Sequence, residues 1–283
     1  MNIIIVSLGT IPNYLQDCIQ QIKLTQKNPS IHLIKNRSSN YKNSDCTIID
    51  VENIPVSQNH LNFIKESKLI NKNFRGFFWR YSTERIYVLD DYIKMKNLSD
   101  VIHIETDVLL YQDLELILPI LKKFNFACVR DNDVRVIGSI IYIKNKDISG
   151  KISSIANDYI NENDMTILNH AAKKIENVFY LPTGKIEHYK ENLKYIFDGA
   201  SIGQFIGGID PRNERRNLMK YINKIRKIFT KNNVISFINK DSEIDIVKWK
   251  IKWINNKPYK KNDTELIPII NLHIHSKDLK KFM

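Results

Sequence analysis

The chain has 283 residues, of which 43% are hydrophobic, enough to bury the core of one large domain or two small ones. Its 43 lysines and arginines outnumber the 31 aspartates and glutamates, and the net charge of +12 favours an anionic partner: nucleic acid, a membrane surface or a phosphorylated small molecule. The N-terminus lacks the features of a secretory signal, and no apolar run approaches the ~20 residues of a membrane span. Three scattered cysteines without metal-type spacing fit a reducing compartment, so we expect a soluble cytoplasmic protein.

The N-terminal segment reads as a strand, a short turn and a helix, which is the opening unit of an α/β fold. A β-branched run at residues 3–6 is followed by small residues and then by helical spacing of apolar residues over 13–26. In α/β folds the turn after the first strand lies where nucleotides bind, so Leu8, Gly9 and Thr10 are candidate nucleotide contacts. The dinucleotide fingerprint GxGxxG is absent, and an ordinary turn between strand and helix explains these three residues equally well.

Strands and helices keep alternating after this opening unit. The expected strands lie at 31–34 and 47–51, and the expected helices lie at 57–69 and 76–95. The last of these helices carries Arg80 and Arg85, and a guanidinium group suits phosphate because it donates two parallel hydrogen bonds. Surface ion pairs with Glu84 or Asp90 are the simpler explanation for either arginine alone.

Residues 101–110 form an apolar run with interleaved polar residues, which predicts a buried strand that reaches the edge of the sheet. The run carries Glu105 and Asp107, and side chains at this spacing on an extended chain project to the same side. Neighbouring carboxylates resist burial unless a cation lies between them. A divalent metal with a diphosphate would meet that need, because Mg²⁺ and Mn²⁺ bind carboxylate and phosphate oxygens. The alternative is that both acids cap the following helix, where Asp113 and Glu115 also lie, and are exposed to solvent.

The middle of the chain continues the alternation of helices and strands. We expect helices at 113–123, 147–160 and 164–175 and strands at 126–129 and 138–143, with a charged connection at 130–133. Asp164 stands at the start of the third helix, where an acidic side chain can cap free backbone N–H groups. The spacing therefore predicts a capping role for Asp164.

Residues 197–213 hold four of the nine glycines in the chain, a density that marks tight turns or close approach to a ligand. Asp198, Gln204 and Asp210 are candidates for hydrogen bonds to a polyhydroxylated ligand, and a loop with capping acids is the alternative. The following segment, 214–231, combines helical apolar spacing with seven lysines and arginines. Such a helix can bind nucleic acid or an anionic membrane, although a solvated face over a packed stripe is the commoner explanation.

Two stretches near the C-terminus alternate like strands. Residues 246–254 place Trp249 and Trp253 on one face, either as a sugar-stacking platform or as packing on the core.

In the second stretch, residues 269–277, alternation puts His273 and His275 on one face, and Lys277 follows. Imidazole is a common metal ligand, and a lysine can neutralise a phosphate. With the acids of the 101–110 run as partners, these residues predict a site for a metal and a phosphate group.

Together these segments resemble a GT-A glycosyltransferase, the metal-using, nucleotide-sugar-dependent class with a DXD motif. The segment HIETD at 103–107 resembles the DXD strand in the variant in which Glu replaces the first Asp. The segment HSK at 275–277, with His273 before it, resembles the C-terminal His and Lys with which many members complete the metal shell and hold the diphosphate. Arg80 and Arg85 lie on the helix before this strand, where related enzymes often carry a basic residue that contacts the nucleotide.

The resemblance implies a single GT-A-like α/β domain over residues 1–283, with a Rossmann-like mixed sheet flanked by helices. In this layout residues 1–110 are the nucleotide-binding half, 111–260 the acceptor half and 261–283 the segment that binds the metal and the diphosphate. The His-to-Lys spacing is shorter than in the retaining enzymes that end in HxxGxxKPW, so their stereochemistry is not transferred.

The implied activity is transfer of a sugar from a nucleoside-diphosphate sugar, expected to be a UDP-sugar, to a hydroxyl of a glycan, protein or small-molecule acceptor. The implied ligands of Mn²⁺ or Mg²⁺ are Glu105, Asp107, His273 and His275, with the ribose as an alternative partner of Glu105. Lys277, with Arg80 or Arg85, would stabilise the departing diphosphate. An inverting reaction also needs a general base, for which Asp198 is the first candidate and Asp164 the second.

Two other classes stay open on the sequence alone. A basic nucleic-acid-binding protein would use residues 214–231 and would show steeply salt-dependent binding. A nucleotidyltransferase would need a glycine-rich phosphate loop, which the sequence lacks. With the transferase resemblance we expect no nucleic-acid partner and at most a peripheral membrane contact through 214–231.

Overall fold

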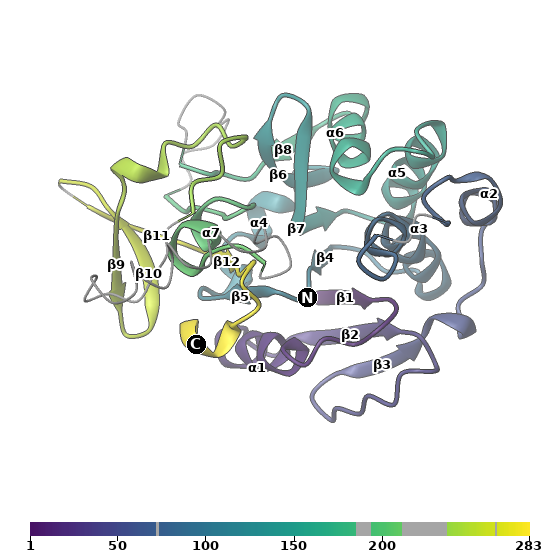
Figure 1. Cartoon of the computed structure of the whole chain (residues 1–283), viewed down its shortest axis with the longest axis horizontal. Coiled ribbons are helices and arrows are strands. Elements are labelled where there is room, and N and C mark those ends of the chain that lie inside the picture. The colour runs from purple at the N-terminus through teal and green to yellow at the C-terminus, as the bar shows by residue number, and fades with distance from the viewer. Residues whose placement is uncertain (72–73, 185–193, 211–236, 264) are drawn as a thin grey trace.

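A seven-stranded sheet forms the centre of the fold, with strand order β3-β2-β1-β4-β7-β6-β8 (Figure 1). The computed structural model describes residues 1–71, 74–184, 194–210, 237–263 and 265–283. The strands of this sheet are β1 (Asn2–Ser7), β2 (Ser30–Lys35), β3 (Thr47–Asp50), β4 (Val101–Ile104), β6 (Phe126–Asn132), β7 (Arg135–Ile143) and β8 (Val178–Tyr180). Since β7 runs antiparallel to both β4 and β6 and the other pairings are parallel, the sheet is mixed. The predicted α/β fold with a Rossmann-like mixed sheet flanked by helices is confirmed.

Strand β1, inside the sheet between β2 and β4, is apolar on both of its faces, and each face is covered. Ile3 and Ile5 pack into one core cluster and Ile4 and Val6 into another, because side chains alternate along a strand. The first cluster lies under α1 (Leu15–Thr25), α4 (Leu118–Leu121) and α7 (Ile202–Gly207). The second lies under α2 (Gln58–Glu66), α3 (Phe78–Lys96), α5 (Lys146–Asp158) and α6 (Asp164–Lys174). The sheet is therefore the middle layer of three, as Figure 1 shows.

Two smaller sheets extend this framework. β5 (Val108–Leu110) pairs antiparallel with β12 (Asn271–His273), which brings the C-terminal segment to the end of β4. β9 (Lys250–Ile254), β10 (Lys257–Lys261) and β11 (Leu266–Pro268) form an antiparallel sheet at the left of Figure 1. The β9–β10 hairpin turns at Asn255 and Asn256, whose positive φ angles of 48° and 58° fit a tight two-residue hairpin turn.

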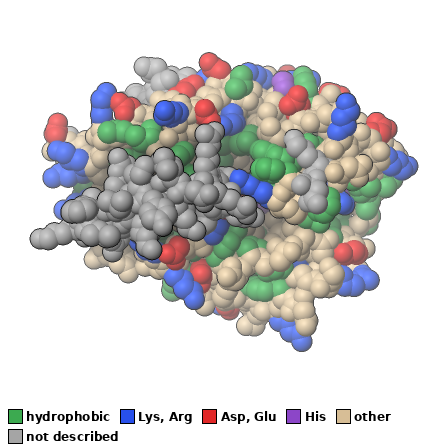
Figure 2. All heavy atoms as spheres, viewed as in Figure 1, with side chains coloured by type: hydrophobic (Ala, Val, Ile, Leu, Met, Phe, Trp, Pro, Cys, Tyr) green, Lys and Arg blue, Asp and Glu red, His purple; other side chains and the backbone are tan. Residues whose placement is uncertain are grey.

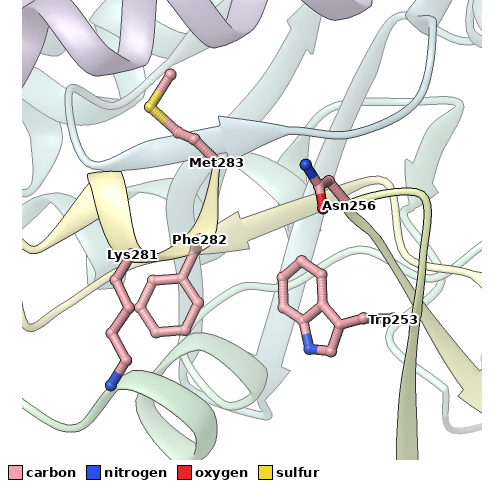
Figure 3. Close-up of a pocket in the computed structure, with 5 residues that line it drawn as sticks. All are labelled: Trp253, Asn256, Lys281, Phe282 and Met283. Atoms are coloured by element: carbon pink, nitrogen blue, oxygen red, sulfur yellow. The ribbon is translucent and has the colours of Figure 1, made fainter.

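The two tryptophans near the C-terminus both pack. Lys260 Nζ lies 4.1 Å from the centroid of the Trp249 ring. Trp253 packs edge-on against Tyr111 and also lines an open hollow of about 320 Å³ beside the C-terminus (Figure 3). Packing is supported for Trp249, which lies against the core, whereas Trp253 is 40% exposed and both alternatives stay open for it.

Several expected elements differ from the structure. The strand expected at 246–254 begins as a 3-10 helix at Ile246–Lys248 before β9. The helix expected at 113–123 is a 3-10 helix at Leu114–Leu116 followed by the short α4, because Pro119 has no N–H for the middle of a longer helix. The charged connection expected at 130–133 belongs mostly to β6, which runs to Asn132 and forms a tight hairpin with β7.

Figure 2 shows how charge is distributed over the described residues of one face. Among its described residues, lysine and arginine side chains are interspersed with acidic ones. The predicted basic helix at 214–231 lies outside the described residues, so its membrane contact stays a prediction. Within the described ranges, none of the helices has the length and the apolar composition needed to cross a bilayer.

A buried polar cluster joins α2 to α3. His60 Nδ1 lies 2.7 Å from Asp91 Oδ2, and His60 Nε2 lies 3.5 Å from Glu84 Oε1. Burial would lower the pKa of His60, but the hydrogen bond to Asp91 and the ion pair with Glu84 raise it from 6.5 to about 9. The imidazolium form of His60 is thus the form that holds the two helices together at neutral pH.

The stability of the protein should therefore depend on the charge of His60. Because the pKa of His60 is higher in the folded chain, its stabilisation is complete below pH 6.5 and is lost as the pH rises through about 9. The full shift corresponds to about 3 kcal/mol. The measurement is urea unfolding of the wild type and of His60→Asn at pH 6 and at a pH above 9. The wild type should lose about 3 kcal/mol of its unfolding free energy relative to His60→Asn between the low and the high pH. A difference that is constant with pH would contradict this assignment.

Candidate active site

The acidic pair lies in the turn between β4 and β5. The single strand expected over 101–110 is interrupted: β4 ends at Ile104, Val108 N donates back to Glu105 O at 3.2 Å, and β5 begins. Asp107 O accepts from Ile274 N at 2.8 Å, which continues the pairing of β5 with β12. Although the chain is not extended here, the carboxylates of Glu105 and Asp107 still lie close together. They lie at the carboxyl end of β4, which runs parallel to β1.

His273 completes a group of three possible metal ligands. It pairs with Val108 across the β5–β12 sheet, and its Nε2 lies 3.2 Å from Glu105 Oε2 and 3.2 Å from Asp107 Oδ2. One ligand atom from each of these three side chains lies within 4.8 Å of the other two. Two carboxylates and one imidazole are a donor set that Mn²⁺ or Mg²⁺ accepts, so these residues fit the expected ion.

Cationic side chains compensate the acids of this group. Burial would lower the pKa of His273, but the neighbouring Asp107 carboxylate raises it to about 9. Burial would raise the pKa of Asp107, whereas Lys277 and then His273 hold it well below its usual range. The Lys277 ammonium forms an ion pair with Asp107 Oδ2 and lies 5.8 Å from the centroid of the Tyr14 ring. A protein cation therefore neutralises Asp107 directly.

His275 does not belong to the three-ligand group found among the described residues. Its ring packs on His273, with centroids 4.1 Å apart, and burial followed by the His273 charge lowers its pKa well below 6.5. Its Nε2 is buried without a hydrogen-bond partner in the described part of the chain. His275 lies beyond the end of β12 and packs on the ring of His273, so a metal contact by His275 stays a prediction.

Arg85 links the acidic turn to α6. Its Nη2 lies 2.6 Å from Glu105 Oε1 and 2.9 Å from Asp164 Oδ2, and all three side chains are mostly buried. A Cβ atom on Gly138 would lie 3.2 Å from this Nη2, so the small residue leaves room for the guanidinium. Removing one partner of a buried ion pair typically costs about 3–5 kcal/mol, because the other charge is left uncompensated. Arg85 therefore keeps Glu105 in place.

Asp164 has a different role from the predicted cap. The cap of α6 is Asn163, whose side chain accepts from Thr166 N, and Asp164 is the first residue inside the helix. Its carboxylate faces Arg85, and burial raises its pKa while Arg85 opposes that shift. Asn163 has the better position because a cap must lie one residue before the first helical turn.

Arg80 and the turn after β1 lie at the N-terminal end of α3. Arg80 Nε donates to Glu84 at 3.1 Å, which is the surface ion pair considered for it. Gly9 has a φ of 76°, and a Cβ there would lie 2.5 Å from the Tyr81 ring, so only glycine fits this turn. Leu8 is half-buried and Thr10 is exposed. Nucleotide contacts by Arg80, Leu8, Gly9 and Thr10 stay predictions.

Asp198 does not have the surroundings of a general base. It is 0% exposed, and its two oxygens accept hydrogen bonds from four backbone N–H groups. A general base must reach the proton it removes, and this carboxylate is enclosed by the chain itself. The structure therefore contradicts the predicted base and gives Asp198 a role in shaping the site. Sequence reasoning also missed its partners Ser139 and Asn271, since an isolated serine or asparagine carries no spacing signal.

No family model matches this chain, and no curated protein matches its sequence. The chain is similar to solved glycosyltransferase structures. One is PaToxG, with 14% identity and a TM-score of 0.36 over 60% of this chain and 63% of that one, less than two thirds of its length. Another is the galactosyltransferase LgtC with donor and acceptor sugar analogues, with 14% identity and a TM-score of 0.43 over 65% and 74%. A third is mouse xyloside xylosyltransferase 1, with 10% identity and a TM-score of 0.42 over 64% and 86%.

Proposed function

We propose that this protein is a metal-dependent glycosyltransferase, which moves a sugar from a nucleoside-diphosphate sugar, with UDP as the expected nucleotide, to an acceptor hydroxyl. The observation that carries the proposal is the convergence of Glu105, Asp107 and His273, beside Lys277, at the carboxyl end of β4. Ligands bind at the carboxyl ends of strands in open α/β sheets. A carboxylate–imidazole group next to a lysine suits a divalent ion that carries phosphate oxygens.

The residues of this group have separate tasks in the proposed reaction. Glu105, Asp107 and His273 would hold Mn²⁺ or Mg²⁺, and His275 would keep the His273 ring in place by packing on it. When bound, the ion supplies a positive charge that stabilises the departing diphosphate. Lys277 would leave Asp107 and bind a phosphate oxygen. Its positive charge would then also stabilise the negative charge that develops on the departing diphosphate.

The acceptor hydroxyl attacks the anomeric carbon of the donor, and the bond from that carbon to the diphosphate breaks. An inverting reaction also needs a base for the hydroxyl proton. For that case we propose Asp164, whose carboxylate lies beside Arg85, the residue that also binds Glu105, and whose pKa is raised by burial. Arg85 would then orient both Asp164 and Glu105.

A panel of UDP-, GDP- and CMP-sugars tests this function. The protein is incubated with each donor, with Mn²⁺ or with a chelator, and the released nucleotide is measured. We expect metal-dependent release from one donor, because a sugar transferase with an open donor site also transfers slowly to water. The same donor, offered with candidate glycan acceptors, should release nucleotide faster. The absence of release and of metal-dependent donor binding across the whole panel would contradict the proposal.

A further inference from the structure

Asp198 is the most fully hydrogen-bonded carboxylate next to the candidate metal group. Its Oδ1 accepts from Ser201 N at 3.0 Å and from Ile202 N at 2.8 Å. Its Oδ2 accepts from Gly203 N at 2.7 Å and from His273 N at 2.9 Å. One side chain thus ties the first turn of α7 to the last residue of β12.

The close contact between α7 and β12 depends on a glycine. A Cβ atom on Gly203 would lie 2.0 Å from the carbonyl oxygen of His273, a distance that no other residue type could keep without moving the backbone. Hydrogen bonds to a charged acceptor are stronger than those to a neutral one, so Asp198 provides a strong clamp where the packing is tightest. The backbone of His273 is therefore held by Asp198 and by its close contact with the first turn of α7.

The backbone at Asp198 in turn fixes the His273 ring. Asn271 pairs with both backbone groups of Asp198, accepting from its N at 3.1 Å and donating to its O at 2.9 Å, and Ser139 Oγ donates to the same O at 3.0 Å. The next carbonyl, Gly199 O, lies 2.5 Å from His273 Nδ1. Since Nδ1 donates its proton to Gly199, Nε2 is the nitrogen that faces Glu105 and Asp107.

We propose that Asp198 is a positioning residue for the metal site: it holds the backbone of His273 through Oδ2, and the carbonyl that follows it holds the His273 ring with Nε2 towards the ion. Partners that orient a metal-binding histidine contribute roughly 10–100-fold to metal affinity. The inference rests on the proposed function, because it assumes that His273 binds a divalent metal. It replaces the base role that the sequence predicted for Asp198.

The test compares Mn²⁺ affinity, measured by electron paramagnetic resonance, in the wild type and in Asp198→Asn. The amide of asparagine cannot accept hydrogen bonds at both of its atoms, so one half of the clamp is lost. We expect Mn²⁺ to bind at least about tenfold more weakly. Ser149→Ala is the matched control: it removes a buried 2.8 Å hydrogen bond to Asp90 in the α3–α5 contact, and its Mn²⁺ affinity should equal that of the wild type.

Two readouts separate positioning from a general loss of stability. A saturating concentration of Mn²⁺ should restore most of the transfer rate of Asp198→Asn, because the reacting groups are intact. In the Mg²⁺-bound wild type, a ¹H–¹⁵N spectrum of the histidine side chains should show His273 with its proton on Nδ1. Mn²⁺ affinity within twofold of the wild type in Asp198→Asn, or a His273 proton on Nε2, would overturn the inference.

A milder variant covers the case in which Asp198→Asn does not fold. Ser139→Ala removes one hydrogen bond to the Asp198 carbonyl, and we expect it to weaken Mn²⁺ binding by roughly threefold to tenfold. Unchanged affinity in Ser139→Ala would count against the inference. These outcomes are distinct from a failure of the proposed function, in which the wild type itself would bind no Mn²⁺.

Discussion

Asp107→Asn should lower metal-dependent sugar transfer by about a thousandfold while the protein keeps its fold. Asp107 is the carboxylate that faces both His273 and Lys277, and its pKa lies well below the usual range despite its burial. Asparagine has the same shape but no charge, so the variant loses attraction for the ion without leaving a cavity. The measurement is kcat/KM for the donor identified in the panel, with Mn²⁺ varied at each donor concentration.

The control for this variant is Asp113→Asn. Asp113 lies six positions further along the chain, and its side chain accepts from Glu115 N at 3.0 Å, a bond that asparagine can also accept. Its kcat/KM should stay close to that of the wild type. If Asp107→Asn retained full activity at every Mn²⁺ concentration, the metal site would have to lie elsewhere.

Lys277→Ala should change metal binding and sugar transfer in opposite directions. In the ligand-free protein the Lys277 ammonium neutralises Asp107, so an arriving ion must displace it. Without the competing cation Mn²⁺ should bind more tightly. The rate of sugar transfer should nevertheless fall by about 10²–10³-fold. This is the typical effect of removing one hydrogen-bond donor that stabilises a developing negative charge in an active site. The backbone of Lys277, with a φ of 65°, is held in the left-handed region, which is uncommon away from glycine and fits a side chain with a defined task.

Calorimetry gives the two affinities separately. Mn²⁺ is titrated into the free protein, and UDP is then titrated into the Mn²⁺-loaded protein, for the wild type, Lys277→Ala and Lys280→Ala. Lys280 is exposed in the C-terminal 3-10 helix, so its removal changes the net charge by the same amount but should affect neither titration. Weaker Mn²⁺ binding in Lys277→Ala would show that the lysine supports the ion and does not compete with it.

The sequence was most informative where chemistry and spacing act within a few residues. The pair Glu105 and Asp107 and the order of His273 and Lys277 are local patterns, and the structure brings all four side chains together. The β-branched run at residues 3–6 likewise predicted the first strand, because that signal lies within the segment itself and needs no distant partner.

Contacts between distant segments could not be predicted. The ion pairs of Arg85 join residues up to 79 positions apart, and the Asp198 clamp reaches 75 positions to His273. The sequence predicted a capping role for Asp164 and ligand contacts or a base role for Asp198, yet the fold pairs Asp164 with Arg85 and encloses Asp198 in backbone N–H groups. The residue type alone does not tell whether an aspartate is exposed in a loop or buried among hydrogen-bond donors, because its surroundings come from distant parts of the chain.

The most direct test of the proposed metal site is Mn²⁺ binding to the wild type, followed by electron paramagnetic resonance with and without UDP. The proposal predicts one saturable Mn²⁺ site, tighter binding when UDP is present, and loss of the site in both Asp107→Asn and His273→Ala. Saturable binding that survives in both variants would place the ion at another site. No Mn²⁺ binding to the wild type, with or without UDP, would contradict the proposal that Glu105, Asp107 and His273 hold a metal for a nucleoside diphosphate.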